Sequence, residues 1–242
     1  MPRYKITIEY DGTNYLGWQR QPEGPTVEKE IEDALSRILQ QPINIVGQGR
    51  TDSGVHAEGQ VAHFDFPEPL VSDQLCYALL GVLPRDIAVY QLVEVPDDFH
   101  ARFDAKSRRY RYQFVTRPSP LRHRHAGMVL NDLDFDAMNE CAAMVCGVHD
   151  FESFVKSNAD QEHAKCEVLT SEFSRQGHLV CYHIEANRFL HHLVRRLAGT
   201  MIEVGKGNRT IAEFKQLLQE PRTDISGHGA QAKGLILETV NY

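Results

Sequence analysis

The order of strand-like and helix-like patterns occurs twice along this chain, and this repetition restricts the fold more than any other feature. Each half reads strand, helix, strand, strand, helix, strand, with one extra helix in the second half. Such split β-α-β patterns fold into an antiparallel sheet with its helices on one face. We therefore predict an α+β protein of two tandem ferredoxin-like domains, 1–98 and 99–242, whose antiparallel sheets are joined side by side around a central cleft.

The first half opens with a strict alternation of apolar and polar residues from Tyr4 to Tyr10, which is typical of a half-buried strand. Thr26 precedes a run with helical spacing and is a plausible N-cap. The predicted elements of this half are a strand over 4–10, a helix over 27–40, strands over 43–46 and 60–66, a helix over 72–83 and a strand over 87–95.

The second half begins with a strand in which Tyr110, Tyr112 and Phe114 share one face, while Arg109 and Arg111 lie on the other. The predicted elements are strands over 107–115, 167–174, 179–185 and 234–240, and helices over 135–146, 188–204 and 210–219. On the strand pattern alone Tyr110 is a core residue. If its face opens into a cleft, the ring is instead a stacking platform for a flipped base.

The ten residues from Gly49 to Glu58 hold the most unusual chemistry, with the carboxylate of Asp52 at their centre. Composition alone allows an ordinary turn, in which Asp and Thr side chains bond to the local backbone, and it also allows a catalytic loop. An aspartate that acts as an anion in a closed site needs a nearby cation. Arg50 and Arg195 are the candidates for that cation.

Charge is unevenly distributed, although the net charge of −7 argues against a nucleic-acid partner on its face. Between Phe99 and His125 the chain has eight Arg or Lys and a single acidic residue, a local charge of +7. A basic stripe with interleaved aromatic rings is typical of a polyanion-binding surface, whereas the alternative is a solvated strand face. The candidate contacts to an RNA backbone are Arg102, Lys106, Arg108, Arg109 and Arg111.

Several functional classes lack their sequence signals. The chain has no apolar run of the roughly 20 residues that cross a bilayer and no glycine-rich nucleotide-binding motif. Its five cysteines include no Cys-x-x-Cys pair, so we expect reduced core thiols in a cytoplasmic protein. A hydrolase built on Asp52, His56 and Thr51 lacks the nucleophile elbow, and the adjacent His191 and His192 lack the spacing of a metal-binding pair.

The residues from Gly49 to Ala57 resemble the signature of the tRNA pseudouridine synthase A family, and further blocks follow in the family's order over essentially the whole chain. These blocks are 10–13, 17–19, 99–103, 109–112, 147–151, 189–195 and 232–235. The resemblance implies a homodimeric isomerase that uses neither a cofactor nor a metal. Its substrate would be tRNA, in which uridines 38, 39 and 40 of the anticodon stem-loop become pseudouridine.

The resemblance also assigns roles to individual residues. Asp52 takes the place of the catalytic aspartate, and Tyr110 takes that of the base-stacking tyrosine. Arg195 would be the ion-pair partner of Asp52, Arg50 would help to splay the target nucleotide, and Leu235 would pack against the uracil. The competing hypothesis is a non-catalytic tandem RNA-binding protein in which Asp52 is only a turn residue.

Overall fold

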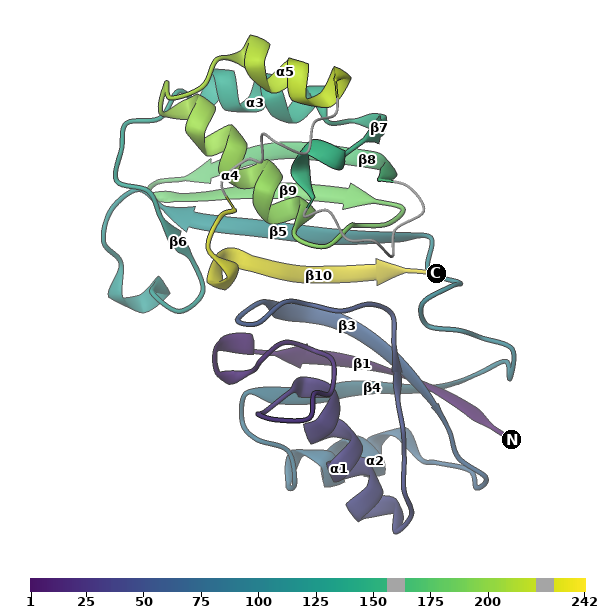
Figure 1. Ribbon diagram of the computed structural model, residues 1–242. Helices are drawn as coiled ribbons and strands as arrows, with labels where there is room; N and C mark the ends of the chain where they lie inside the picture. The colour runs from purple at the N-terminus through teal and green to yellow at the C-terminus, as the bar shows by residue number, and fades with distance from the viewer. Residues whose placement is uncertain (156–163, 221–228) are drawn as a thin grey trace. The chain divides into compact units, whose positions relative to one another are not determined.

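The computed structural model describes residues 1–155, 164–220 and 229–242 (Figure 1). The chain divides into two compact units, which we call unit 1 (Met1–Lys106 with Ile236–Tyr242) and unit 2 (Ser107–Leu235). Each unit combines a sheet with helices, so the predicted α+β class is confirmed. The domain ranges 1–98 and 99–242 stay a prediction. Unit 1 differs from the first range because it also includes residues 99–106 and 236–242.

The sheet of unit 1 is built around β1 (Arg3–Tyr10), which pairs antiparallel with β3 (His56–Asp65) and β4 (Ile87–Val95). Two further strands pair with β3: the short β2 (Val46–Gly47) is antiparallel to it, and β10 (Leu235–Asn241) is parallel. The 3-10 turn η1 (Gly12–Asn14) follows β1, and the helices are α1 (Val27–Leu39) and α2 (Ser72–Leu80). The four apolar residues that alternate along β1 are all buried, as the pattern predicts.

The sheet of unit 2 runs in the order β5 (Ser107–Val115), β9 (Leu179–Ala186), β8 (Lys165–Gln176) and β7 (Gly147–Asp150), with every neighbouring pair antiparallel. The short β6 (Gly127–Met128) pairs parallel with β5. Helices α3 (Phe135–Met144), α4 (Leu193–Gly205) and α5 (Ile211–Gln219) pack against one another, and α4 also contacts β5 (Figure 1). The remaining 3-10 turns are η2 (Pro120–Arg122), η3 (Glu152–Phe154) and η4 (Ala232–Gly234).

Thr26 precedes α1 in an extended conformation, but the prediction that its side chain caps the helix is wrong. Among the described residues its buried hydroxyl has no hydrogen-bond partner. The first amides of the helix bond elsewhere: Val27 donates to the carbonyl of Gly17 at 3.2 Å, and Glu28 donates to that of Trp18 at 3.0 Å. The turn before the helix therefore does the capping, which a local sequence pattern does not reveal.

Other boundaries also differ from the predictions. The strand predicted to start at residue 60 begins at His56, so the end of the Gly49–Glu58 segment is not a loop. The helix predicted from Arg188 begins at Leu193, because His192 adopts a left-handed conformation (φ 65°) that a helix cannot contain. The short strands β6 and β7 were not predicted. One prediction of pairing also changes, because β10, expected in an antiparallel sheet, runs parallel to β3. The unpredicted β6 is likewise parallel to β5.

The cysteines are only partly the core thiols that the sequence suggests. Cys141 and Cys166 are buried, and burial raises the pKa of each thiol to about 11. Cys146 is exposed, and Cys76 and Cys181 are half-buried. No helix within the three described ranges is long and apolar enough to cross a membrane.

Candidate active-site loop and tyrosine strand

Asp52 lies in a segment of unit 1 that we call the aspartate loop, residues 48–55, beside a second segment, residues 11–20, that we call the turn segment. Backbone hydrogen bonds join the two on both sides of Asp52. The amide of Trp18 donates to the carbonyl of Thr51 at 3.1 Å, and the amide of Gly54 donates to that of Tyr15 at 3.3 Å. These two hydrogen bonds therefore fix the backbone on either side of the carboxylate.

Side chains add to this attachment. The hydroxyls of Tyr10 and Thr51 lie 2.7 Å apart in a buried hydrogen bond. The Ser53 hydroxyl donates to the carbonyl of Tyr15 at 3.2 Å. Asp52 itself is half-buried between these two anchored neighbours. A half-buried carboxylate on a rigid backbone is suited to act as a nucleophile or as a base toward a bound molecule.

Glycines make the close approach of the two segments possible. A Cβ atom at Gly12 would lie 2.0 Å from the carbonyl oxygen of Val55, and one at Gly17 (φ 100°) would lie 2.5 Å from that of Thr51. Gly54 also has a positive φ of 75°. At Gly49, by contrast, no atom of the described residues lies within 4 Å of the position that a Cβ would take.

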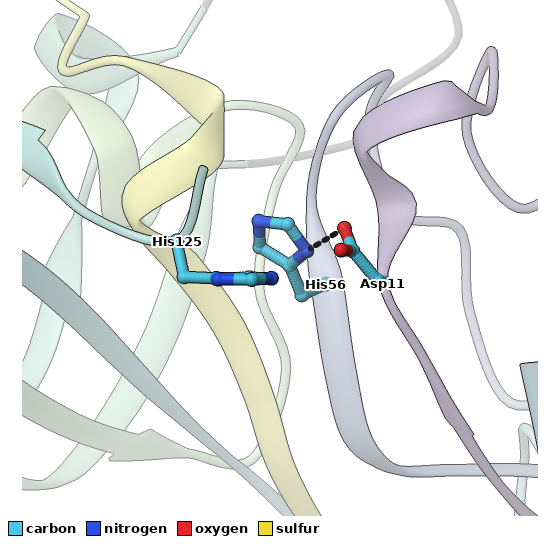
Figure 2. Close-up of side chains that lie close together, drawn as sticks. All are labelled: Asp11, His56 and His125. Carbon is cyan, nitrogen blue, oxygen red and sulfur yellow. Dashed lines mark ion pairs between the residues drawn. The ribbon is translucent and has the colours of Figure 1, made fainter. Parts of the chain in front are cut away.

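The buried imidazole of His56 follows the aspartate loop at the start of β3. Its Nδ1 atom lies 3.0 Å from Asp11 Oδ1 and 3.1 Å from the backbone nitrogen of Gly12 (Figure 2). The Nδ1 of His56 is thus directed at the turn segment, and the hydroxyl of Thr51 is bonded to Tyr10. These contacts give both groups structural partners and disfavour the hydrolase built on Asp52, His56 and Thr51.

Arg50, the other predicted functional residue of this loop, is exposed. It lies near Glu28 in the first turn of α1. Burial raises the pKa of the Glu28 carboxyl. Two hydrogen bonds oppose that rise, one from the Arg20 amide at 2.7 Å and one from the Trp18 side chain. The positive charge of Arg50 opposes it as well. The guanidinium of Arg50 therefore has an anion nearby in unit 1 and remains accessible to a ligand.

Unit 2 holds Arg195 on the first turn of α4, where it is half-buried. Its Nε donates to the carbonyl of Ala230 at 2.9 Å, and the amide of Ala230 donates to the carbonyl of Arg195 at 3.0 Å. One terminal nitrogen lies 3.4 Å from Nδ1 of His192. The guanidinium is thus oriented by its own unit, unlike that of a solvated surface arginine.

Tyr110 lies on β5 with 9% of its surface exposed, and its ring packs edge-on against Phe189 at a centroid distance of 5.1 Å. Tyr112 lies two residues further along the same face of β5. Burial raises its pKa to about 12, whereas the charge of Arg195 opposes the rise. Leu235 is 7% exposed. The preceding residue, Gly234, lies against β5, because a Cβ atom there would be 2.6 Å from the carbonyl oxygen of Gln113. The alternating face of β5 is therefore largely buried, as the core interpretation of Tyr110 predicts.

The five candidate RNA-backbone residues do not form one uniform surface. Arg102 and Lys106 belong to unit 1 and are exposed, with the guanidinium of Arg102 over the ring of Phe103. The other three lie on β5 in unit 2 and are half-buried. They are Arg108, which donates to the carbonyl of Asn187 at 2.9 Å, Arg109, opposite Glu185 on β9, and Arg111, opposite His183.

The turn segment is the part of the site that spacing and composition did not reveal. Asp11 to Asn14 follow the first predicted strand and carry no helical or strand period, yet the turn segment supplies hydrogen-bond partners of Thr51, Ser53 and His56. A signal was present in the glycines Gly12 and Gly17, which lie in blocks that carry the family resemblance. Local patterns cannot show which distant backbone a glycine admits.

Unit 1 holds a half-buried aspartate on a loop that backbone hydrogen bonds fix, and unit 2 holds a tyrosine strand and an oriented arginine. The chain is an α+β protein. A family model described as tRNA pseudouridine synthase matches residues 6–104 and 141–242. The chain belongs to this family, and it is accordingly an isomerase that makes pseudouridine.

Curated relatives agree over the full chain, and each of the following is named tRNA pseudouridine synthase A. The protein of Chlorobaculum tepidum is 44% identical over 239 residues, which are 98% of this chain and 97% of that protein. The protein of Parabacteroides distasonis is 40% identical over 244 residues (100% and 96%), and that of Myxococcus xanthus is 41% identical over 245 residues (100% and 92%).

Proposed function

We propose that this protein converts uridine to pseudouridine in tRNA, at positions 38, 39 and 40 of the anticodon stem-loop. The observation that supports this most directly is the placement of Asp52, a half-buried carboxylate whose flanking residues Thr51 and Ser53 are both bonded to the turn segment. Membership of the family supports the reaction, formation of pseudouridine, and the names of the relatives support tRNA as the substrate.

The reaction rearranges one nucleotide, so its atoms balance without an added reactant. The C1′–N1 bond of uridine breaks, the uracil rotates, C5 forms a bond to C1′, the proton on C5 leaves, and N1 takes up a proton. Asp52 starts this sequence either by attacking the nucleotide covalently or by removing a sugar proton to give a glycal. Tyr110 and Asp52 are the two candidate bases for the C5 proton.

The other residues bind the flipped nucleotide. Tyr110 stacks on the uracil, and Leu235 packs against it. Arg195 pairs with the Asp52 carboxylate through opposite charge. Arg50 helps to hold the nucleotide out of the RNA helix. Its exposure, with Glu28 nearby, supports a role in contacting a ligand.

Release of tritium from tRNA labelled at uridine C5 tests the proposal, since formation of the C5–C1′ bond expels that atom and RNA binding does not. We expect release with the wild-type protein and none with Asp52→Asn, which should fold and bind tRNA nearly as well. Asp98→Asn, at an exposed aspartate outside the site, is the matched control and should release tritium at the wild-type rate. Full activity of Asp52→Asn would refute the assignment of the catalytic residue.

The second candidate, a non-catalytic tandem RNA-binding protein, is favoured by the local charge of +7 between residues 99 and 125. Such a protein would bind tRNA, with an affinity that falls steeply with salt, and would release no tritium. A small-molecule hydrolase would show neither property. One labelled tRNA thus separates the three functions.

The proposal includes a homodimer that acts in the cytoplasm, where its substrate is used. A tRNA is larger than a single chain of 27.5 kDa can enclose, so a second subunit would extend the binding surface. Light scattering on the purified protein, at the concentrations used for the tritium assay, should report about twice the mass of one chain. The mass of a single chain would contradict this part.

A further inference from the structure

The segment between β5 and β6, residues 116–126, concentrates positive charge that the site described above does not use. We call it the basic loop. It contains Arg117, Arg122 and Arg124 together with two histidines, and no Asp or Glu occurs between residues 116 and 131. Every one of the three arginines is exposed.

The arginines of this loop differ from those of β5. Arg117 makes one long contact, 3.4 Å, to the carbonyl of the adjacent Pro118. Within the described parts of the chain, the guanidinium groups of Arg122 and Arg124 make no hydrogen bond or ion pair. On β5, in contrast, Arg109 is half-buried, and its cross-strand neighbour on β9 is the acidic residue Glu185. The positive charge that remains free for a ligand is therefore in the basic loop rather than along the strand.

Internal bonds hold the loop in one shape. The amide of Arg122 donates to the carbonyl of Ser119 at 3.0 Å, and the amide of His125 donates to that of Arg122, also at 3.0 Å. Nδ1 of His123 lies 2.8 Å from the carbonyl oxygen of Pro120, and both prolines of the loop restrict the backbone. An element that is already ordered loses less conformational entropy when a ligand binds.

Two further bonds place the loop beside the uracil-binding residues proposed for unit 2. The Gln113 side chain on β5 donates to the carbonyl of His125 at 2.6 Å. Lys233, two residues before Leu235, donates through Nζ to the carbonyl of His123 at 2.9 Å. These two bonds attach the loop to the strand that carries Tyr110 and to the turn that leads to Leu235.

The outermost apolar residue of the loop is Leu121, whose surface is 96% exposed. It lies in η2 next to Arg122. A single exposed leucine needs no explanation by itself. Here its position beside exposed cations suits contact with a nucleic acid, in which apolar ribose and base surfaces alternate with phosphates.

We propose that the basic loop is the main phosphate-binding element of unit 2 and grips the RNA backbone next to the target uridine. This inference rests on the proposed function for its ligand, tRNA. Each phosphate neutralised by an arginine releases condensed counterions, so the loop contributes directly to the salt dependence of binding. Phosphate contacts position the RNA without reading its sequence. Such a loop suits an enzyme that acts on several tRNAs.

The test removes the charge of the loop in the variant Arg117→Gln/Arg122→Gln/Arg124→Gln. The matched control, Arg37→Gln/Arg85→Gln/Lys215→Gln, removes three exposed cations elsewhere on the chain. The affinity of each protein for unmodified tRNA is measured by fluorescence anisotropy over a range of KCl concentrations. We expect the loop variant to reduce the slope of log Kd against log salt by about 2 to 3, because each phosphate contact contributes roughly 0.7 to 0.9. The control should reduce it by much less.

Steady-state tritium release by the same proteins provides the second measurement. The loop variant should raise KM by about tenfold or more at low salt and leave kcat within about twofold, since the lost contacts bind substrate and transition state alike. Leu121→Ser should weaken binding without changing the salt slope. Equal slopes and equal KM values for the loop and control variants would overturn the inference. The proposed function would stand in that case, because it fails only if the wild-type protein releases no tritium.

Discussion

Nδ1 of His56 lies 3.0 Å from Oδ1 of Asp11, and the same nitrogen lies 3.1 Å from the amide nitrogen of Gly12. The two contacts are alternatives as hydrogen bonds. An unprotonated Nδ1 accepts from the amide, whereas a protonated Nδ1 donates to the carboxylate. In either form the imidazole ties the start of β3 to the turn segment. It therefore secures the aspartate loop at its C-terminal end.

We expect His56→Ala to lower the free energy of unfolding by about 1 to 3 kcal/mol, the cost of leaving a buried amide without its partner. It should also slow tritium release, since the loop around Asp52 loses an anchor. His56→Asn, whose side-chain oxygen can accept from Gly12, should recover part of both. Urea unfolding and the tritium assay measure the two effects. Equal losses for Ala and Asn would indicate that volume, rather than the hydrogen bond, is what His56 supplies.

The glycines of the site provide a matched pair. A methyl group at Gly12 would lie 2.0 Å from the backbone carbonyl of Val55, so Gly12→Ala must push the turn segment and the aspartate loop apart. We expect a loss of about 1 to 3 kcal/mol of stability, as for overpacking of a close contact, and a large loss of activity. Gly49→Ala, whose new Cβ would meet nothing within 4 Å, should be nearly neutral in both respects. Similar behaviour of the two variants would show that the loops tolerate separation.

His63 should make stability depend on pH. Burial, followed by the charges of Arg3 and His100, lowers its pKa to about 4, and its Nδ1 accepts from the amide of Ala101 at 3.1 Å. The unfolded chain, with an ordinary pKa near 6.5, binds this proton first as the pH falls. The contribution is thus constant above about pH 6.5 and declines toward pH 4, by up to about 3 kcal/mol in total.

Urea unfolding at pH 7.0 and pH 5.0 measures this dependence. His63→Asn keeps an acceptor for Ala101 but cannot be protonated in this range, so its stability should change less between the two pH values than that of the wild type. His178→Asn, at a half-buried histidine of unit 2, is the control and should behave as the wild type. If the free energy of unfolding of His63→Asn changes between the two pH values as much as that of the wild type, groups other than His63 cause the pH dependence.

Tyr110→Phe should keep tRNA affinity and lower kcat by about 10²-fold or more, the usual contribution of a positioned base, if the hydroxyl removes the C5 proton. Tyr110→Ala should in addition weaken tRNA binding by about 1 to 3 kcal/mol through the loss of stacking. Tyr112→Phe, on the same face of β5, controls for the loss of a buried hydroxyl. Anisotropy and tritium release separate binding from turnover. An unchanged kcat in Tyr110→Phe would leave Asp52 as the base.

Elements with a clear period were predictable from the sequence. β4 and β5 have the predicted bounds, and α1 begins at the predicted residue, because alternation along a strand and a 3.6-residue repeat along a helix are local properties. The start of α4 was missed, since the left-handed backbone of His192 is not encoded by periodicity. The strands β6 and β7 were missed because two and four residues contain too little alternation to predict a strand.

The candidate site, too, contains residues that the sequence revealed and residues that it did not. Asp52 and Arg50 stood out because a carboxylate and a guanidinium between two glycines form an unusual combination, and the resemblance to a family gave each a role. The partners that hold Asp52 did not stand out. Tyr10, Tyr15 and Trp18 are apolar strand and turn residues by composition, and their hydrogen bonds to the aspartate loop span more than thirty positions of the chain.

The sequence by itself determined the α+β class, most strands and helices, and the residues with catalytic potential, because these follow from local periodicity and from side-chain chemistry. Only the tertiary structure decided that β10 pairs parallel with β3, where a Cβ at Gly59 would lie 2.5 Å from the carbonyl oxygen of Glu238. It also decided that the turn segment holds the aspartate loop. Both depend on which distant backbones approach closely, and that choice is made by the packing of the whole unit, which no single segment encodes.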